Sequence, residues 1–178
     1  VAEAVRVLQG LPRAQRDGFK LSVNLSGATI SDESSAAYIL DLLNRSGVDP
    51  RRLQFEITET AAIRQFDRAL SLIHRLRAHG CYVALDDFGS GLSSLRYLQE
   101  IPVDCLKIDG AFIRKMELSD VDFTMVSTIN HLAHIMGIAT IAESVENALQ
   151  LSMLRELGVD YAQGFFIAMP QPLESILA

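Results

Sequence analysis

Residues 82–87, Tyr-Val-Ala-Leu-Asp-Asp, join a short apolar run to two adjacent acids. A run of four to six apolar or β-branched residues, followed by a segment with helical spacing, is typical of one βα unit. The chain contains six such runs, each ending in a polar group that can bind a metal ion or move a proton: residues 21–24, 53–56, 82–87, 105–109, 138–143 and 159–163. This recurrence predicts an α/β fold with a parallel sheet.

The segments between these runs show helical spacing. Apolar residues three and four positions apart form three stripes, which are Ala36, Ile39, Leu40 and Leu43, then Ala69, Leu72, Ile73 and Leu76, then Val126, Ile129, Ala133 and Met136. Glycines stand where a helix should end before the next strand, at Gly47, Gly80, Gly137 and Gly158. The spacing therefore predicts strands and helices in alternation.

The number of strands leaves two architectures open. A closed (β/α)₈ barrel typically needs about 250 residues, whereas these 178 residues contain six credible strands and open inside a predicted helix. The fold is either an open six-stranded sheet or a TIM-barrel-like fold whose amino-terminal strands are missing. We favour the second, with residues 1–178 as one amino-terminally truncated domain.

Composition excludes several classes of protein. The chain is 49% hydrophobic with no apolar run near 18 residues, which predicts a soluble, cytoplasmic domain. A formal net charge of −6 disfavours binding to polymeric nucleic acid. Cys81 and Cys105 lack metal-type spacing and are predicted to be buried free thiols. His131 and His134 share a helix face but have no third ligand, so we assign them no metal.

The polar residues at the strand ends predict a metal site. In parallel α/β folds ligands bind at the carboxyl ends of the strands, so these side chains should gather on one face. Oxygen ligands point to Mg²⁺ or Mn²⁺ rather than zinc. Asp86 is placed to bridge two ions, as in phosphoryl transfer, while Lys107 would orient a water or offset phosphate charge. The gathered residues are Asn24, Glu56, Asp86, Asp87, Lys107, Glu143 and Gln163.

Some of these residues have ordinary structural alternatives. Asp109 is a candidate catalytic residue, but it precedes Gly110-Ala-Phe and would equally cap a turn. Glu59 would equally be a first-turn helix acid that the helix dipole favours. The Asp86-Asp87 pair, taken alone, would also fit a role in stabilising a turn. That polar residues at all six strand ends serve only to stabilise turns is a weaker explanation.

The ordered motifs of this chain resemble those of bacterial EAL domains, which are cyclic di-GMP phosphodiesterases with a TIM-barrel-like fold. The resemblance runs from Val1 to Ala178. The motifs are Ser22-Val-Asn-Leu-Ser26, Glu56-Ile-Thr-Glu59, Asp86-Asp-Phe-Gly-Ser-Gly91, Leu106-Lys-Ile-Asp109, Ala142-Glu-Ser-Val-Glu146 and Gln163-Gly-Phe-Phe166.

This resemblance implies roles for the candidate residues and a reaction. Asn24, Glu56 and Asp86 would bind a first metal ion, and Asp86 would bridge to a second ion held by Asp87 and Glu143. Lys107 would contact the attacking water, Gln163 would line the metal and water site, and Glu59 would brace the mobile loop 87–91. Water activated by the metals would open cyclic di-GMP to linear pGpG.

The chain also departs from the family pattern. The Glu-Ala-Leu signature, whose glutamate is another first-metal ligand, does not occur in it. Ser144 stands where the family usually has Gly, and Gly110 where it often has Arg. We therefore expect an active parent protein, with Mg²⁺ or Mn²⁺ as cofactor, and an inactive isolated 178-residue chain.

Two alternatives from other classes stay open at this point. A degenerate EAL-like module would bind cyclic di-GMP or a protein partner without hydrolysis. A retaining glycosidase would use two carboxylates such as Glu56 and Glu143, but the chain has no Trp to stack on sugars. The resemblance also implies a homodimer, sensory or GGDEF-type domains in the parent chain, and a parent that is in some cases anchored to the inner membrane.

Overall fold

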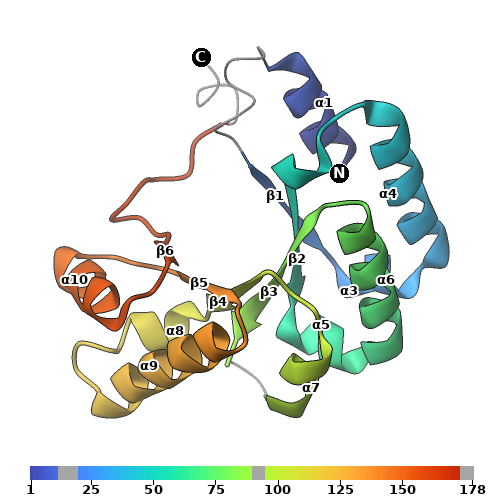
Figure 1. Ribbon diagram of the computed structural model, residues 1–178. Helices are drawn as coiled ribbons and strands as arrows, with labels where there is room; N and C mark the ends of the chain where they lie inside the picture. Colours follow the sequence, from blue (N-terminus) through green and yellow to red (C-terminus); the bar gives the residue numbers. More distant parts are fainter. Residues whose placement is uncertain (12–19, 90–94, 173–178) are drawn as a thin grey trace. The chain divides into compact units, whose positions relative to one another are not determined.

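The computed structural model describes residues 1–11, 20–89 and 95–172 of the chain (Figure 1). The strands are β1 Leu21–Leu25, β2 Leu53–Thr58, β3 Tyr82–Phe88, β4 Cys105–Ile108, β5 Ala139–Ala142 and β6 Tyr161–Ala162. The helices are α1 Ala2–Gly10, α3 Gly27–Ser31, α4 Glu33–Ser46, α5 Glu59–Arg64, α6 Phe66–Ala78, α7 Leu95–Glu100, α8 Gly110–Ile113, α9 Asp120–Ile135 and α10 Ala148–Leu157, with a 3₁₀ turn at Pro50–Arg52.

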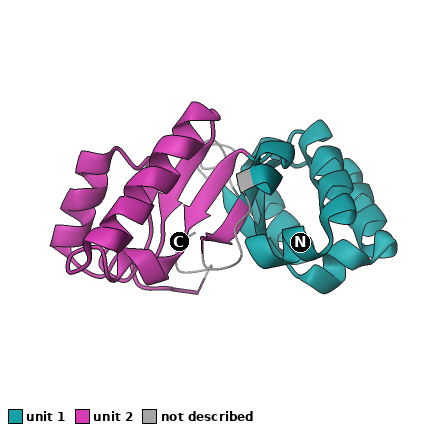
Figure 2. Cartoon of the chain, turned by 90° about the horizontal axis from the view of Figure 1, so that it is seen from below, with its two compact units in different colours: residues 1–84, 94–103 teal, residues 85–93, 104–178 magenta. Residues whose placement is uncertain are grey.

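The chain forms two compact units (Figure 2). The first contains residues 1–84 and 94–103, and the second contains residues 85–93 and 104–178. Strand β3 begins in the first unit and ends in the second. Strand order follows the chain, with β1, β2 and β3 adjacent in the first unit and β3, β4, β5 and β6 adjacent in the second.

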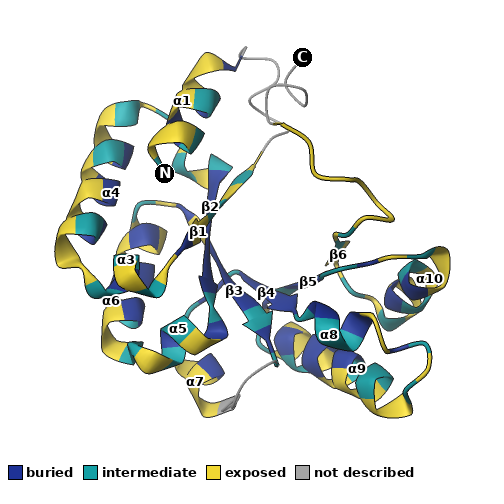
Figure 3. Cartoon of the chain, turned by 180° about the vertical axis from the view of Figure 1, so that it is seen from behind, coloured by how far each residue is buried: buried dark blue, intermediate teal, exposed yellow. Residues whose placement is uncertain are grey.

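In the first unit, β1 and β2 are parallel, and their register places Asn24 beside Glu56. The predicted stripes of α4 and α6 are the buried faces of these helices, seen in dark blue in Figure 3. Asp32 caps α4 by accepting hydrogen bonds from two backbone amides, and the helix ends at Gly47 with φ of 65°. The side-chain cap and the left-handed glycine explain why the helix occupies residues 33–46.

In the second unit, β4 pairs with β5 and β5 with β6, both in parallel. All four residues of β4 are buried, as expected for a parallel strand covered on both faces. Helix α9 contacts both β4 and β5, and buries Val126, Ile129 and Ala133 as predicted. Met136 is the C-cap residue of this helix and only partly buried.

The predicted alternation of six strands and intervening helices is confirmed, but several strand ends differ. Strand β2 continues two residues beyond Glu56, and β3 continues one residue beyond Asp87. The last strand is shorter than the predicted 159–163 run, because the Val159 amide donates to Leu154 O at the end of α10. Both cysteines are buried and neither forms a disulfide, as predicted.

Candidate active site

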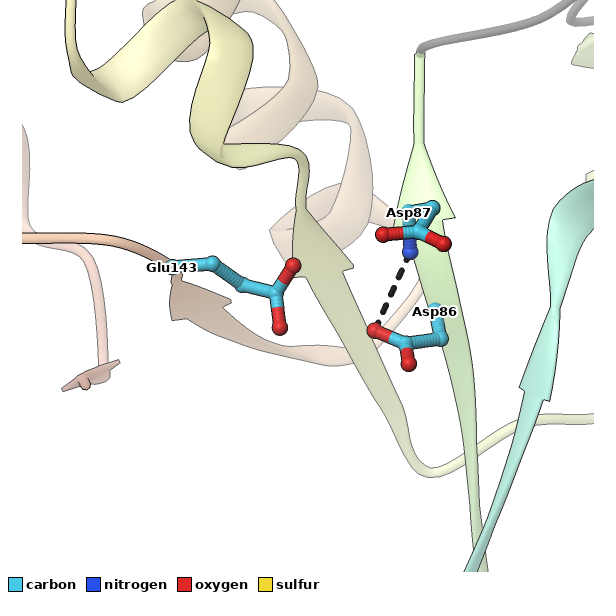
Figure 4. Close-up of side chains that lie close together, drawn as sticks. All are labelled: Asp86, Asp87 and Glu143. Carbon is cyan, nitrogen blue, oxygen red and sulfur yellow. Dashed lines mark hydrogen bonds between the residues drawn. The ribbon is translucent and has the colours of Figure 1, made fainter. Parts of the chain in front are cut away.

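Three carboxylates of the second unit meet at the strand ends. Asp86 and Asp87 come from β3, and Glu143 follows β5 directly (Figure 4). Each offers one carboxylate oxygen, and these oxygens lie within 4.8 Å of one another. Such a group of hard oxygen donors matches the ligand preference of Mg²⁺ or Mn²⁺. This part of the predicted metal site is therefore assembled within a single unit.

The backbone at Asp87 explains how two adjacent acids reach one cluster. Successive side chains of a regular strand point to opposite faces. Asp87 has φ of 54°, in the left-handed region that non-glycine residues rarely adopt, which interrupts this alternation. Its amide donates to Asp86 Oδ1 at 3.1 Å, drawn as the dashed line in Figure 4. Backbone strain of this kind persists only where the surrounding structure holds it in place. It is found most often at functional sites.

Lys107 supplies a positive charge to this cluster. It lies in β4, and its Nζ is 2.7 Å from both Asp86 Oδ1 and Glu143 Oε1. The Lys107 side chain is only 5% exposed, so these pairs are poorly screened by solvent. Among the described residues, three clustered carboxylates nevertheless face this ammonium. Carboxylates about 4 Å apart repel by about 4 kcal/mol at an effective dielectric near 20. The cluster is therefore suited to binding a further cation.

Burial, and after it the neighbouring negative charges, raises the pKa of two acids of this cluster. Burial, followed by the charges of Asp86 and Asp109, raises the pKa of the Asp87 carboxyl, while Lys107 opposes the rise. Burial also raises the pKa of Glu143, and the hydrogen bond and charge of Lys107 only partly offset it. A bound divalent cation would favour the ionised form of both groups.

Gln163 lies against Glu143, beside a close backbone approach of Gly164 to Val145. Its Nε2 donates to Glu143 Oε1 at 2.8 Å. Its carbonyl accepts from the Val145 amide at 3.0 Å, and the next residue, Gly164, lies so near Val145 that an added Cβ would be 2.2 Å from Val145 N. Only glycine allows this approach, which explains Gly164 after Gln163.

Asp109 has the capping role that its position in the sequence suggested. Its Oδ1 accepts a hydrogen bond from the Ala111 amide at 2.6 Å, so that Asp109 is the N-cap of α8. Its charge also contributes to the raised pKa of Asp87. Its predicted catalytic role stays a prediction alongside this capping role.

The remaining predicted residues lie in the first unit. Asn24 and Glu56 are register partners on β1 and β2; Asn24 is exposed and Glu56 is buried. Glu59 is the first residue of α5, is 4% exposed, and follows the N-cap Thr58. This position fits the helix-dipole alternative. Their metal and loop-bracing roles stay predictions, and Ser90 and Gly91 of the predicted mobile loop lie outside the described residues.

Two departures from the family pattern, Gly110 and Ser144, are in contact. A Cβ at Gly110 would lie 2.3 Å from Ser144 Oγ and 2.7 Å from Ser144 Cβ. Ser144 itself has φ of 56°. Gly110 therefore provides the space that the Ser144 side chain occupies, and the two positions should tolerate substitution only together.

We expect Gly110→Ala to destabilise the protein by about 2 kcal/mol, because the Ser144 Cβ is fixed to the backbone and cannot move aside cheaply. Ser144→Gly should stabilise it by about 0.5 kcal/mol, since relief of the left-handed conformation outweighs the entropy cost of glycine. In the double variant most of the Gly110→Ala loss should disappear. Urea denaturation of the four proteins measures this coupling, and additive effects would show that the contact does not matter.

A pocket with both polar and apolar walls adjoins the acid cluster. It has a volume of about 490 Å³ and is lined by Glu143, Gln163, Phe165 and Met169, among others. Phe165 is 65% exposed and Met169 60% exposed. This volume lies within the range of small-molecule sites, which combine apolar walls with a few polar groups. Phe165, Ala168 and Met169 lie only a few residues beyond Gln163 in the sequence, yet their part in a pocket could not be predicted without the fold.

Sequence comparison identifies the family of this chain and several relatives. Residues 1–170 match the model of the EAL domain family. The chain is 41% identical over 155 residues to the cyclic di-GMP phosphodiesterase PdeB of Shewanella oneidensis, covering 87% of this chain and 18% of PdeB. It is 35% identical over 160 residues to MucR of Pseudomonas aeruginosa, a bifunctional diguanylate cyclase/cyclic di-GMP phosphodiesterase, covering 90% of this chain and 23% of MucR. The chain thus spans about a fifth of the length of these relatives.

Solved structures show the same fold. The PaMucR phosphodiesterase in complex with c-di-GMP has a TM-score of 0.89 and 33% identity, covering 99% of this chain and 71% of that one. The FimX EAL domain from Pseudomonas aeruginosa bound to c-di-GMP has a TM-score of 0.86 and 25% identity, covering 96% and 67%. These neighbours confirm the predicted TIM-barrel-like α/β fold. Given its match over residues 1–170, this chain belongs to the EAL domain family.

Proposed function

We propose that the protein containing this chain hydrolyses cyclic di-GMP to linear pGpG, with a divalent ion, Mg²⁺ or Mn²⁺, held by Asp86, Asp87 and Glu143. The observation that carries the proposal is the oxygen cluster of these residues within 4.8 Å, joined to the buried Lys107. Relatives named as cyclic di-GMP phosphodiesterases and EAL structures with bound c-di-GMP support the choice of substrate.

The residues around the cluster fit the needs of phosphodiester hydrolysis. Water forms a new bond to phosphorus while the bond to the ribose 3′ oxygen breaks, and that oxygen takes up a proton. Divalent ions supply charge stabilisation and a lowered pKa of water in such sites. Lys107 Nζ carries a positive charge at Asp86 and Glu143, where it would offset phosphate charge and orient the water. Gln163 fixes the orientation of the Glu143 carboxylate.

The pocket beside Glu143 supports a small nucleotide rather than a polymer. Its aromatic and thioether side chains, Phe165 and Met169, offer surfaces on which a base can pack. The formal net charge of −6 also argues against binding to polymeric nucleic acid. Asn24 and Glu56 stay predicted ligands of the first ion, which Asp86 would bridge to the second ion held by Asp87 and Glu143. A homodimer stays a prediction as well. None of the helices in the described parts of the chain is long and apolar enough to cross a membrane.

Hydrolysis by the full-length protein tests the proposal. We expect chromatography to detect pGpG when cyclic di-GMP is incubated with Mg²⁺ or Mn²⁺, and none with EDTA. Ca²⁺ should inhibit, because it prefers longer and looser coordination than a compact phosphoryl-transfer site provides. Equal turnover in EDTA would refute the metal-dependent reaction. Binding of cyclic di-GMP without pGpG under any ion would instead favour a nucleotide-binding module.

A further inference from the structure

Asp160 lies just before β6 and binds the beginning of β5. Its Oδ2 accepts hydrogen bonds from Thr140 N at 2.8 Å and from His134 Nε2 at 2.9 Å, and lies 3.1 Å from Thr140 Oγ1. Although burial raises it, the pKa of Asp160 is held below its usual value by the hydrogen bonds from Thr140 and His134. An ionised carboxylate here accepts several donors at once.

Helix α9 completes this network from the other side. Asn130 and His134 are four residues apart and therefore share one helix face. Asn130 Oδ1 is 2.6 Å from Thr140 Oγ1, and its Nδ2 donates to Leu157 O, at the end of α10, at 2.9 Å. Asn130 and Thr140 are 4% and 0% exposed. The network therefore joins α9, α10 and the amino end of β5 to Asp160, the residue that precedes β6.

The opposite ends of β5 and β6 carry Glu143 and Gln163. The register pairs Ile141 with Tyr161 and Ala142 with Ala162, and the Gln163 amide donates to Ala142 O at 2.8 Å. A slip of one residue would turn every side chain of β6 to the other face. With only two residues in β6 and Tyr161 63% exposed, apolar packing contributes little to this register. Asp160 makes the polar contacts that can fix it.

We infer that Asp160 is a positioning residue, which sets the register of β6 on β5 and thereby holds Gln163 against Glu143. The metal-binding consequence rests on the proposed function, whereas the register itself does not. The backbone amide of Thr140 is the essential partner, because a strand amide is fixed in space. His134 forms a half-exposed contact of the kind that contributes little by itself.

Hydrogen exchange of residues 161–168 and Mn²⁺ titration of the full-length protein test this inference together. For Asp160→Ala we expect exchange of this segment to accelerate about tenfold and Mn²⁺ to bind about tenfold more weakly, as loss of a charge-assisted hydrogen bond implies. Asp160→Asn should restore most of the protection, because its Oδ1 can still accept from Thr140 N. His134→Gln should stay within about twofold of the wild type in both measurements.

Leu154→Ala is the matched control for general destabilisation. Leu154 is buried on α10 and its truncation should lower the melting temperature at least as much as Asp160→Ala. Well below that temperature, its Mn²⁺ affinity and the exchange of residues 161–168 should stay within about twofold of the wild type. Unchanged exchange in Asp160→Ala, or equal acceleration in Leu154→Ala, would overturn the inference. Failure of the wild type to bind Mn²⁺ would refute the proposed function, while the exchange data would still decide the register.

Discussion

Asp86→Asn in the full-length protein should lower the rate of cyclic di-GMP hydrolysis by about a thousandfold or more. Asp86 belongs to the carboxylate cluster and also contacts Lys107, so that the substitution removes one charge from the proposed metal site and one partner of the ammonium. Loss of about 4 kcal/mol of transition-state stabilisation corresponds to this factor. The fold should persist, because Glu143 still neutralises Lys107 and the amide is nearly isosteric. Product release measured by chromatography at saturating Mn²⁺ gives the rate.

A matched control is Glu156→Gln, which removes one negative charge from an exposed position on α10. Its turnover and Mn²⁺ affinity should equal those of the wild type. A folded Asp86→Asn protein that retains more than a tenth of the wild-type rate would contradict the assignment of Asp86 to the metal site.

Lys107→Met should separate metal affinity from turnover. The substitution removes the Lys107 ammonium, which is the common partner of the Asp86 and Glu143 carboxylates. The metal-free protein should therefore be destabilised by about 3 kcal/mol. Mn²⁺ no longer competes with a positive charge, so it should bind about tenfold more tightly. Turnover should nevertheless fall about a hundredfold, because the positive charge that would face the phosphate is gone. Calorimetric Mn²⁺ titration and steady-state kinetics measure the two effects on the same sample.

Lys115→Met removes a lysine charge from an exposed position of the same unit and should change neither quantity. Weaker Mn²⁺ binding by Lys107→Met would show that Lys107 supports the site structurally rather than competing with the ion. Unchanged turnover would remove Lys107 from the proposed reaction.

The positions of the strands and helices follow from the sequence because they depend on local patterns. The apolar stripe of α6 and the αL glycine at Gly47 could be read directly, since helix burial and helix termination each require particular residue types at fixed spacing. The gathering of Asp86, Asp87, Lys107 and Glu143 could also be predicted, because carboxyl ends of neighbouring parallel strands lie at one edge.

Other features of the site depend on backbone conformation and on contacts distant in sequence. The left-handed conformation of Asp87 is not encoded by a glycine, so its strand appears regular in the sequence. The contact of Gly110 with Ser144 joins positions 34 residues apart, and each departure looks isolated until the structure places them together. Asp160 precedes a strand of two residues, too short to show any periodicity.

The position of Lys107 weakens the alternative that the protein is a retaining glycosidase. Its ammonium lies at hydrogen-bonding distance from two of the three clustered carboxylates, whereas that mechanism needs one protonated and one free carboxylate on either side of a sugar. A nucleotide-binding EAL module without hydrolysis would keep the same fold and pocket, so its distinction from an enzyme depends on the metal.

Anomalous diffraction from crystals of the full-length protein grown with Mn²⁺ tests the central claim most directly, because it locates the ion independently of activity. We predict a manganese peak within coordination distance of carboxylate oxygens of Asp86, Asp87 and Glu143, and its loss in Asp86→Asn. A saturating Mn²⁺ concentration that yields no peak at these three residues, or a peak only elsewhere, would contradict the account.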